Sequence, residues 1–189
     1  WSRLGNDKTS QFAEVADALT RWGRRLHDAV TLDGEVVALD DEGRPTGFQQ
    51  LQGRIHVAGT GPATNRQALA FIAFDVLRAA GHDLREQPLH ERRSVLEHLM
   101  ASAIRQRGDT LRLSEQVRGD GRALYERALA SGWEGLIAKR IDSRYKSGKR
   151  SPDWCKLKIV HEQEFVVGGW TAPRNARSYF GALLLGVYD

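Results

Sequence analysis

Residues 133–158 combine the residue types and the spacing best suited to chemistry. This stretch holds every lysine of the chain except Lys8, and near its start an acid, Glu134, stands beside a glycine. Lys156 and Lys158 are two positions apart, so in a strand both side chains point to the same face. Two ammonium groups aimed at one point form a phosphate site, and a nearby carboxylate is suited to hold a divalent metal against that phosphate. The stretch therefore predicts nucleotide phosphate chemistry.

The basic residues inside this stretch also permit a plainer interpretation. Such a run is usually a solvated surface loop. Its members are Lys139, Arg140, Lys146, Lys149 and Arg150. The lysine pair that follows the run favours the phosphate site, because lysines rarely lie within apolar strands unless an anion meets them.

A second candidate is the run Asp33-Gly34-Glu35, which lies between apolar residues. Asp-Gly in this setting is typical of a β-hairpin turn, and by itself this interpretation is favoured. The functional alternative places Glu35 at the edge of a site, where its carboxylate would accept hydrogen bonds from a ribose hydroxyl or assist a metal.

The third candidate is Phe74-Asp75, within the apolar run of residues 71–77. Without further context we favour a core phenylalanine followed by an acid that a backbone group or an arginine satisfies, because buried acids need partners. The functional alternative uses Phe74 as a flat surface for a purine base, and such stacking contributes about 1–3 kcal/mol per base.

Other catalytic chemistries find little support in the sequence. Cys155 is the only cysteine, which excludes an internal disulfide and a cysteine-based zinc site. No arrangement of serine, histidine and acid suggests a nucleophilic hydrolase, and we expect no thiol enzyme. No two histidines have metal-ligand spacing, and none is assigned to catalysis. The histidines are His27, His56, His82, His90, His98 and His161.

Size and composition indicate a folded, slightly basic chain. Its 189 residues suffice for one packed domain, or for one domain and part of a second. A hydrophobic content of 41% and five tryptophans argue against disorder. The 28 basic and 24 acidic residues give a net charge of +4, which permits a polyanionic partner and also favours solubility. The sequence shows no membrane span and no signal peptide, so we expect a cytosolic location.

Helices and strands must alternate to position these candidates. Apolar residues at spacings of three, four and seven predict a helix over residues 7–26, with Asp7, Thr9 or Ser10 as its cap. Pro88 opens a second helix, and Gly132 ends a third at residues 120–131. Between them we expect strands at 30–39 and 71–77, a turn at 40–45 and a loop at 53–67. The strand at 71–77 is expected to be buried except at Asp75.

The character of the chain changes after Lys158. Residues 165–170 and 182–188 predict two strands joined by a basic loop that contains proline, without a helix signal. We place a domain boundary near residues 159–162 and interpret the remainder as the opening of a small β domain.

Taken in order, the motifs resemble those of the ATP-dependent DNA ligases, within the superfamily of covalent nucleotidyltransferases. The likeness is closest to the ligase module of the bacterial end-joining ligase. Five segments carry it. They are Ser2-Arg3-Leu4-Gly5-Asn6-Asp7 (S-R-N-G-x-D, with leucine in place of asparagine), Asp33-Gly34-Glu35 (D-G-E), Phe74-Asp75-Val76-Leu77 (F-D-[IVL]-L), Glu134-Gly135-Leu136-Ile137-Ala138-Lys139 (E-G-[LIV]-[LIV]-x-K) and Trp154-Cys155-Lys156-Leu157-Lys158 (W-x-K-x-K).

The resemblance implies a fold and an activity. The expected fold is mixed α/β: an ATP-grasp-like nucleotidyltransferase domain at 1–160, followed at 161–189 by the start of an OB-fold β-barrel. The expected enzyme is an ATP-dependent DNA ligase of repair and end joining, which seals strand breaks through enzyme-adenylate and DNA-adenylate intermediates with ATP and Mg²⁺ or Mn²⁺. The expected partners are nicked or broken duplex DNA, an end-binding protein and polymerase or nuclease modules, with no membrane, at the nucleoid of a bacterial cytoplasm.

The resemblance also assigns roles to individual residues. Phe74 would stack on adenine, Glu35 would contact the ribose, and Glu134 would position the metal. Lys156 and Lys158 would bind the α-phosphate and the charge that builds on it in the transition state. The remaining nucleotide-binding positions are basic. They are Arg3, which would lie near the DNA or the nucleotide phosphate, Lys139 and Arg150.

One motif of the family is missing from the chain. The family nucleophile lies in K-x-D-G, and no lysine here is followed two positions later by Asp-Gly. The motif order places it before Ser2, and the chain resembles a fragment that also lacks most of the OB-fold domain. The other lysines are poor substitutes, because a nucleophile must lie in line with the α-phosphate at near-attack distance. We expect that these residues alone cannot form the adenylate.

Two rival functions stay open on the sequence. Within the superfamily, an RNA ligase or a capping guanylyltransferase shares the motifs, and a comparison of ATP with GTP in nucleotidyl transfer separates them. From another class, a non-catalytic nucleic-acid-binding protein could keep the fold without its lysine. The presence of K-x-D-G upstream of Trp1 would decide against that alternative.

Overall fold

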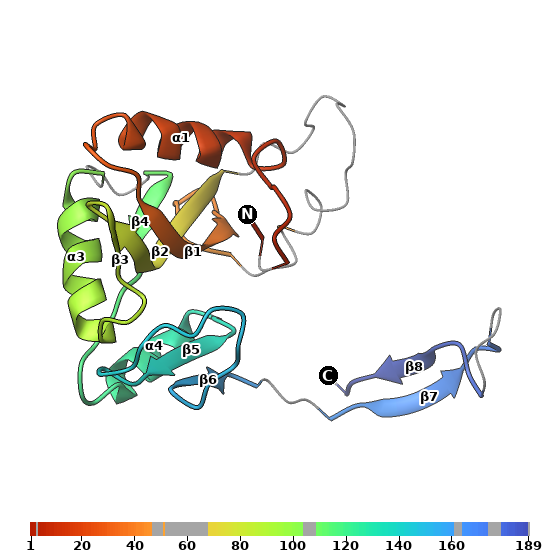
Figure 1. Cartoon of the computed structure of the whole chain (residues 1–189). Helices are drawn as coiled ribbons and strands as arrows, with labels where there is room; N and C mark the ends of the chain where they lie inside the picture. The colour runs from red at the N-terminus through yellow and green to blue at the C-terminus, as the bar shows by residue number, and fades with distance from the viewer. Residues whose placement is uncertain are drawn as a thin grey trace. The chain divides into compact units, whose positions relative to one another are not determined.

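The computed structural model has the mixed α/β architecture that the sequence predicts (Figure 1). It describes residues 1–2, 4–46, 51, 68–103, 109–160, 164–173 and 179–188. The chain divides into two compact units, Trp1–Lys158 and Ile159–Asp189. The predicted adenylation domain at 1–160 and OB-fold opening at 161–189 stay predictions, because compactness alone does not identify a domain. The predicted loop at 53–67 lies outside the described residues.

β2 (Leu69–Ala79) is the central strand of the larger unit. It pairs antiparallel with β1 (Thr31–Ala38) and β3 (His82–Asp83), and parallel with β4 (Leu111–Leu113). Ala80 and Gly81 join β2 to β3, with positive φ angles of 48° and 77°. A tight hairpin turn that matches the strand twist requires this conformation. β2 therefore touches every other strand of its sheet.

Helices α1 (Ala13–Gly23) and α3 (Leu89–Ala101) pack on this sheet and close the main core (Figure 1). A helix with one apolar stripe buries that stripe against its neighbours. The buried members of the core cluster are Ala18, Trp22, Ala73, Val76, Ala79, Leu96, Met100 and Leu111. Burial of each large side chain in it contributes about 1.5–3 kcal/mol.

Both helices differ in detail from their predictions. The predicted start of the first helix is wrong: Asp7 accepts a hydrogen bond from the backbone of Thr9 in a turn (2.8 Å), and α1 begins at Ala13. The second helix opens at Pro88 as predicted, but its buried face also contains two arginines, Arg92 and Arg93. Their partners come from other elements, which the helix sequence cannot show.

The hairpin interpretation of Asp33-Gly34 is wrong, because both residues lie inside β1. A Cβ atom on Gly34 would lie 2.4 Å from the Phe71 ring and 2.7 Å from the carbonyl oxygen of Ile72. Glycine is therefore needed for the close approach of β1 and β2 rather than for a turn.

The pairing of β1 with β2 contains a bulge at Phe74. Asp33 pairs with Asp75 and Gly34 pairs with Ala73, so Phe74 has no partner on β1. Such a bulge re-aims a side chain. The expectation that Asp75 interrupts the burial of this strand is wrong, since Asp75 is fully buried.

A second, two-stranded sheet follows in the larger unit. β5 (Gly135–Lys139) pairs antiparallel with β6 (Trp154–Lys158), and α4 (Arg122–Ala130) packs against β5. Gly132 has a φ of 66°, so the third helix ends as predicted in a left-handed glycine. Residues 140–153 connect β5 to β6.

The smaller unit contains the two predicted strands. β7 (Val166–Trp170) and β8 (Leu183–Gly186) form an antiparallel pair, and no helix occurs among the described residues after 158. Throughout the described part of the chain, no helix is both long and apolar enough to cross a membrane.

Candidate active site

Three aromatic rings from different elements meet beside the Phe74 bulge. The ring centroids of Phe74 and Trp154 are 6.1 Å apart, and those of Tyr145 and Trp154 are 5.8 Å apart. Both pairs cross at 79°, the edge-to-face arrangement that aromatic quadrupoles favour. β2, β6 and the connection between β5 and β6 thus contribute one ring each.

The ammonium group of Lys139 lies within this cluster. Its Nζ is 4.2 Å from the centroid of Phe74 and 3.7 Å from that of Trp154, so both rings make cation–π contacts with it. Burial lowers the pKa of Lys139 to about 8, against the attraction of Asp75 and Asp33. The surface-loop interpretation is therefore wrong for Lys139, whereas Arg140, Lys146, Lys149 and Arg150 are exposed.

Asp75 forms a buried ion pair behind the cluster. Its two carboxylate oxygens each accept a hydrogen bond of 2.8 Å from Arg92, and both side chains are fully buried. Arg92 also donates to the carbonyl oxygens of Gln87 (2.6 Å) and Ser143 (3.0 Å). The predicted partner for Asp75, an arginine, is confirmed.

Asp33 has a hydrogen-bond partner that is distant in sequence. Its Oδ2 accepts a hydrogen bond of 2.6 Å from the hydroxyl of Tyr145, 112 residues later in the chain. Burial, and then this hydrogen bond, raises the pKa of Tyr145 well above its usual value. The phenol therefore stays protonated and acts as a donor.

The predicted phosphate-binding lysines continue from the aromatic cluster along β6. Lys139 pairs with Trp154 across the two strands, and Ile137 pairs with Lys156. Side chains two positions apart share a face and lie about 7 Å apart. Lys156 and Lys158 therefore follow Trp154 along one face of the sheet.

Glu134 lies where β5 begins, beside this row of lysines. Its carboxylate is 3.8 Å from the Nζ of Lys156, and both side chains are at least half exposed. A Cβ on the next residue, Gly135, would lie 2.1 Å from the carbonyl oxygen of Leu157. The glycine of the E-G pair is thus required by the close pairing of β5 with β6.

The other predicted site residues are less closely connected. Glu35 is exposed on β1, on the same face as Asp33 because it is two positions away. Arg150 is exposed in the connection from β5 to β6. In the part of the chain that the structure describes, neither residue has a hydrogen bond or ion pair with another predicted site residue. Arg3 lies outside the described residues.

Sequence reasoning missed several residues that build the cluster. Asp33 and Trp154 belong to quoted motifs but received no role, and no role was predicted for Tyr145 or Arg92. Arg92 could have been suspected, because a buried acid such as Asp75 needs a cation and α3 offers adjacent arginines. Tyr145 had no usable signal, since its partner Asp33 is distant in sequence.

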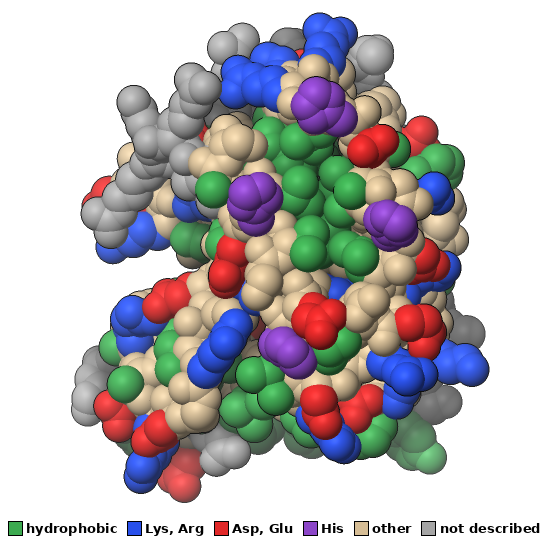
Figure 2. Space-filling view, turned by 60° about the vertical axis from the view of Figure 1, so that its left-hand side comes forward, with side chains coloured by type: hydrophobic (Ala, Val, Ile, Leu, Met, Phe, Trp, Pro, Cys, Tyr) green, Lys and Arg blue, Asp and Glu red, His purple; other side chains and the backbone are tan. Residues whose placement is uncertain are grey.

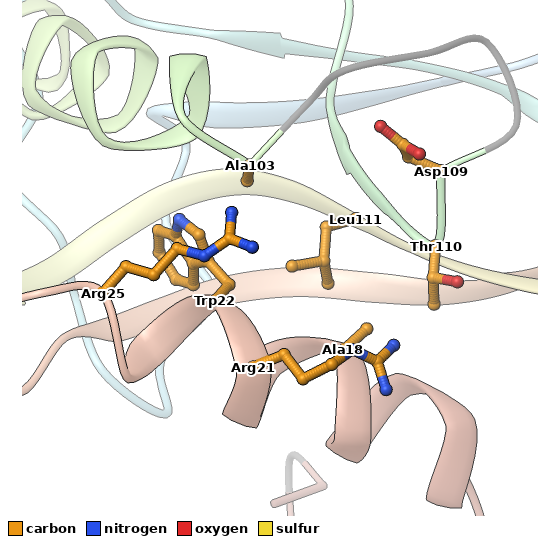
Figure 3. Close-up of a pocket in the computed structure, with 8 residues that line it drawn as sticks. All are labelled: Ala18, Arg21, Trp22, Arg25, Ala103, Asp109, Thr110 and Leu111. Carbon is orange, nitrogen blue, oxygen red and sulfur yellow. The ribbon is translucent and has the colours of Figure 1, made fainter.

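The cavity of about 210 Å³ shown in Figure 3 lies elsewhere. It is bounded by α1 and the start of β4, and no predicted site residue lines it. Its lining residues are Ala18, Arg21, Trp22, Arg25, Ala103, Asp109, Thr110 and Leu111. Because no predicted site residue and, among the described residues, no group of metal-binding side chains lines it, we assign it no ligand.

Metal-binding side chains do not gather at a ready-made site. Within the described residues, no group of three or more His, Cys, Asp or Glu side chains could hold a metal ion. On the face in Figure 2 the histidines are separated from one another by other side chains. The cluster and the lysine row instead suit a ligand with an aromatic part and an anionic part.

Comparisons with known proteins agree with this chemistry. A family model described as "ATP dependent DNA ligase domain" matches residues 1–158. The multifunctional non-homologous end joining protein LigD of Pseudomonas aeruginosa is 41% identical over 188 residues, which cover 100% of this chain and 21% of that protein. The chain therefore spans about a fifth of the length of this relative.

Two solved structures are similar over the whole chain. The crystal structure of the ligase domain from M. tuberculosis LigD has a TM-score of 0.67 and 36% identity, and it covers 100% of this chain and 55% of that chain. A mycobacterial DNA ligase D complexed with ATP and MES has a TM-score of 0.66 and 35% identity at the same coverage.

Proposed function

Because this chain belongs to the ATP-dependent DNA ligase family, we propose that it supplies the nucleotide site of a ligase that seals DNA strand breaks in end joining. The reaction proceeds through an enzyme-adenylate and a DNA-adenylate. The observation that carries the proposal is the row formed by Phe74, Lys139 and Trp154 and continued along β6 by Lys156 and Lys158.

The row is aromatic at one end and cationic at the other, which matches the base and the phosphates of ATP. At the aromatic end, Phe74 stacks on adenine; Lys139 covers one face of its ring, so the base uses the other. Further along, Lys156 and Lys158 bind the α-phosphate and the charge that develops on it. Glu35, exposed on the side of β1 that carries Asp33, accepts hydrogen bonds from the ribose. Arg150 is proposed as a further nucleotide-binding residue, and Arg3 as a residue near the DNA or the nucleotide phosphate.

A divalent metal ion, Mg²⁺ or Mn²⁺, fits the residues present. Mg²⁺ is usually held by one or two carboxylates, substrate phosphates and water rather than by a cage of protein ligands. Glu134 offers one exposed carboxylate beside Lys156, and this suits a metal that arrives with the nucleotide. When bound, the metal neutralises phosphate charge.

Duplex DNA with a nick or break is the proposed polymeric substrate. The net charge of +4 suits a polyanion, and binding through phosphates weakens steeply with salt. The P. aeruginosa relative carries the word "multifunctional" in its name. An end-binding protein and polymerase or nuclease modules are proposed as partners, and the bacterial cytoplasm, near the nucleoid, as the location.

We assign the larger unit to the adenylation domain and the smaller one to the beginning of an OB-fold domain. The apolar residues of β7 and β8 are widely exposed, with Trp170 at 70% and Leu184 at 55%. An isolated two-stranded hairpin is marginally stable. The hairpin therefore suits a larger β domain whose other strands cover it.

Removal of a lysine charge tests the site. In the full-length ligase, Lys158→Ala is expected to slow nucleotidyl transfer from ATP by about 10²–10³-fold, since it removes a fixed charge at the transition state. Its unfolding free energy is expected to change by less than about 0.5 kcal/mol, because Lys158 is exposed. Lys149→Ala, another exposed lysine, is the matched control. A similar loss in both variants, or a loss that parallels unfolding, would contradict the assignment.

A further inference from the structure

We infer that Tyr145 is a positioning residue of the nucleotide site: anchored by Asp33, its ring holds Trp154 edge-on against Phe74. The inference rests on the proposed function of that aromatic cluster. In this role Tyr145 acts through its neighbours and not by binding the nucleotide. Its effect passes through Trp154, which lies between it and Phe74.

The two sheets of the larger unit need such a residue. No strand of the described residues pairs the β1–β4 sheet with the β5–β6 sheet. Their relative position therefore depends on the linking segment at residues 114–134, on side-chain contacts, and on the contacts that residues 140–153 make with the first sheet and α3. Phe74 belongs to the first sheet, and Lys139 and Trp154 belong to the second. The cluster forms only when the two sheets are held at a fixed position relative to each other.

Hydrogen bonds to its backbone hold the connection at residues 140–153 in place. The carbonyl oxygen of Ile141 accepts a hydrogen bond from the backbone of His90 (3.0 Å), and that of Ser143 accepts one from Arg92 (3.0 Å). The backbone of Tyr145 then donates to the carbonyl oxygen of Arg85 (2.8 Å). These contacts fix the position of the Tyr145 backbone.

The side chain of Tyr145 adds contacts to both sheets. Its hydroxyl donates to Asp33 on β1 (2.6 Å), and its ring meets Trp154 on β6 at 5.8 Å. The guanidinium carbon of Arg92 lies 5.8 Å from the same ring. Among the contacts described, Tyr145 thus connects β1 directly with β6. Loss of the hydroxyl bond frees the ring, and with it Trp154.

The test separates positioning from stability. In the full-length ligase, Tyr145→Phe keeps the ring and removes only the bond to Asp33. We expect the half-saturating ATP concentration for enzyme-adenylate formation to rise about tenfold, because a hydrogen bond to a charged group is lost. The maximal rate at saturating ATP is expected to stay within about twofold. Tyr125→Phe, which alters a more exposed tyrosine on α4, should change neither.

A double-mutant cycle identifies the route of the effect. If Tyr145 acts through Trp154, then Tyr145→Phe should have no further effect on ATP saturation in a Trp154→Ala background. A full tenfold effect in that background, or a fall in the maximal rate alone, would overturn the inference. Should Tyr145→Phe fold poorly, Asp33→Leu removes the same bond from the other side and is judged by the same two readouts.

Phe74→Ala separates this inference from the proposed function. If Phe74→Ala leaves ATP saturation unchanged, the cluster is not the nucleotide site and the proposed function fails. If Phe74→Ala weakens saturation while Tyr145→Phe does not, the site stands and the positioning role is wrong.

Discussion

Arg92, which is fully buried, and Lys139, which is partly buried, show two ways in which this fold accommodates a cation away from water. Arg92 has a carboxylate and two carbonyl oxygens as acceptors, arranged around its planar guanidinium. Lys139 instead has the faces of two aromatic rings, which attract its charge without replacing the water that it has lost. The pKa of Lys139 is accordingly lowered to about 8 by burial.

This lowered pKa predicts a pH-dependent stability. The folded-state pKa of Lys139 is about 8 and the ordinary value is 10.5, so the unfolded chain binds more protons between these values and stability rises with pH there. The contribution is complete above 10.5 and is lost as the pH falls through 8. Relative to Lys139→Met, we expect the unfolding free energy of the unsubstituted chain to rise by on the order of 3 kcal/mol between pH 8 and 10.5.

Chemical denaturation at several pH values measures this difference. Lys149→Met, at an exposed lysine, is the control and should leave the pH profile unchanged. A Lys139→Met profile parallel to that of the unsubstituted chain would show that Lys139 titrates normally in the fold.

Much at the residue scale could be predicted from local patterns, and the rest could not for a physical reason. The strand alternation that puts Lys156 and Lys158 on one face is a local property. The aromatic cage of Lys139 depends on Phe74, 65 positions earlier in the numbering, and on Trp154 across the sheet. No local pattern specifies that meeting.

At the scale of elements, β1 depends on a glycine that local rules assign to a turn. Asp-Gly favours hairpins in general, but here the approach of the Phe71 ring decides. We expect Gly34→Ala to destabilise the chain by about 1–3 kcal/mol, because overpacking forces strands or side chains to shift. Gly23→Ala at the end of α1, where an added Cβ meets nothing within 4 Å, is the control.

Thermal or chemical denaturation tests the pair of variants. Gly23→Ala is expected to be neutral or to stabilise the chain by up to about 1 kcal/mol, since alanine favours helix. If Gly34→Ala behaves in the same way, the close approach of β1 and β2 is not a constraint on the fold.

The ion pair of Asp75 with Arg92 joins β2 to α3 and predicts an asymmetry between single and double substitution. Arg92→Leu leaves a buried carboxylate without its cation and is expected to cost about 3–5 kcal/mol. The double variant Asp75→Leu with Arg92→Leu should recover much of this loss, because no charge is then buried alone.

An exposed pair at the start of α4 provides the comparison. Arg122 and Asp120 are exposed by 86% and 60%, and Arg122→Leu should cost less than about 1 kcal/mol. An Arg92→Leu cost as small as this, measured by denaturation, would contradict the claim that Asp75 depends on Arg92 in the fold.

The elements themselves were largely predictable where proline and glycine mark a helix boundary or where an apolar run marks a strand. The helices at Leu89–Ala101 and Arg122–Ala130 and the strands β2, β7 and β8 follow from their own sequences. The burial of Arg92 and Arg93 on α3 did not follow, because Arg92 meets Asp75 on β2 and Arg93 meets the carbonyl oxygen of Ser114. Tertiary partners overrode the rule that arginines face solvent.

At the scale of the whole molecule, the row that runs from Phe74 to Lys158 determines which steps with ATP we propose for this chain. The row contacts the base and the α-phosphate in the proposed site, but transfer needs a nucleophile in line with that phosphate. No lysine of the chain is followed two positions later by Asp-Gly. Lys139 has the lowered pKa that would favour attack, yet the aromatic rings hold its ammonium group at the base end.

We therefore expect the 189-residue chain to bind ATP without forming a covalent adenylate. The chain is incubated with α-labelled ATP and Mg²⁺, denatured and examined for protein-bound label, and a ligase that contains the K-x-D-G lysine serves as the positive control. Binding of ATP is measured separately, so that absence of label is not confused with absence of binding. Covalent label on this chain, located at Lys139 by mass spectrometry, would show that the caged lysine can leave its rings and reach the phosphate, and would reassign it from the base end of the site to the nucleophile.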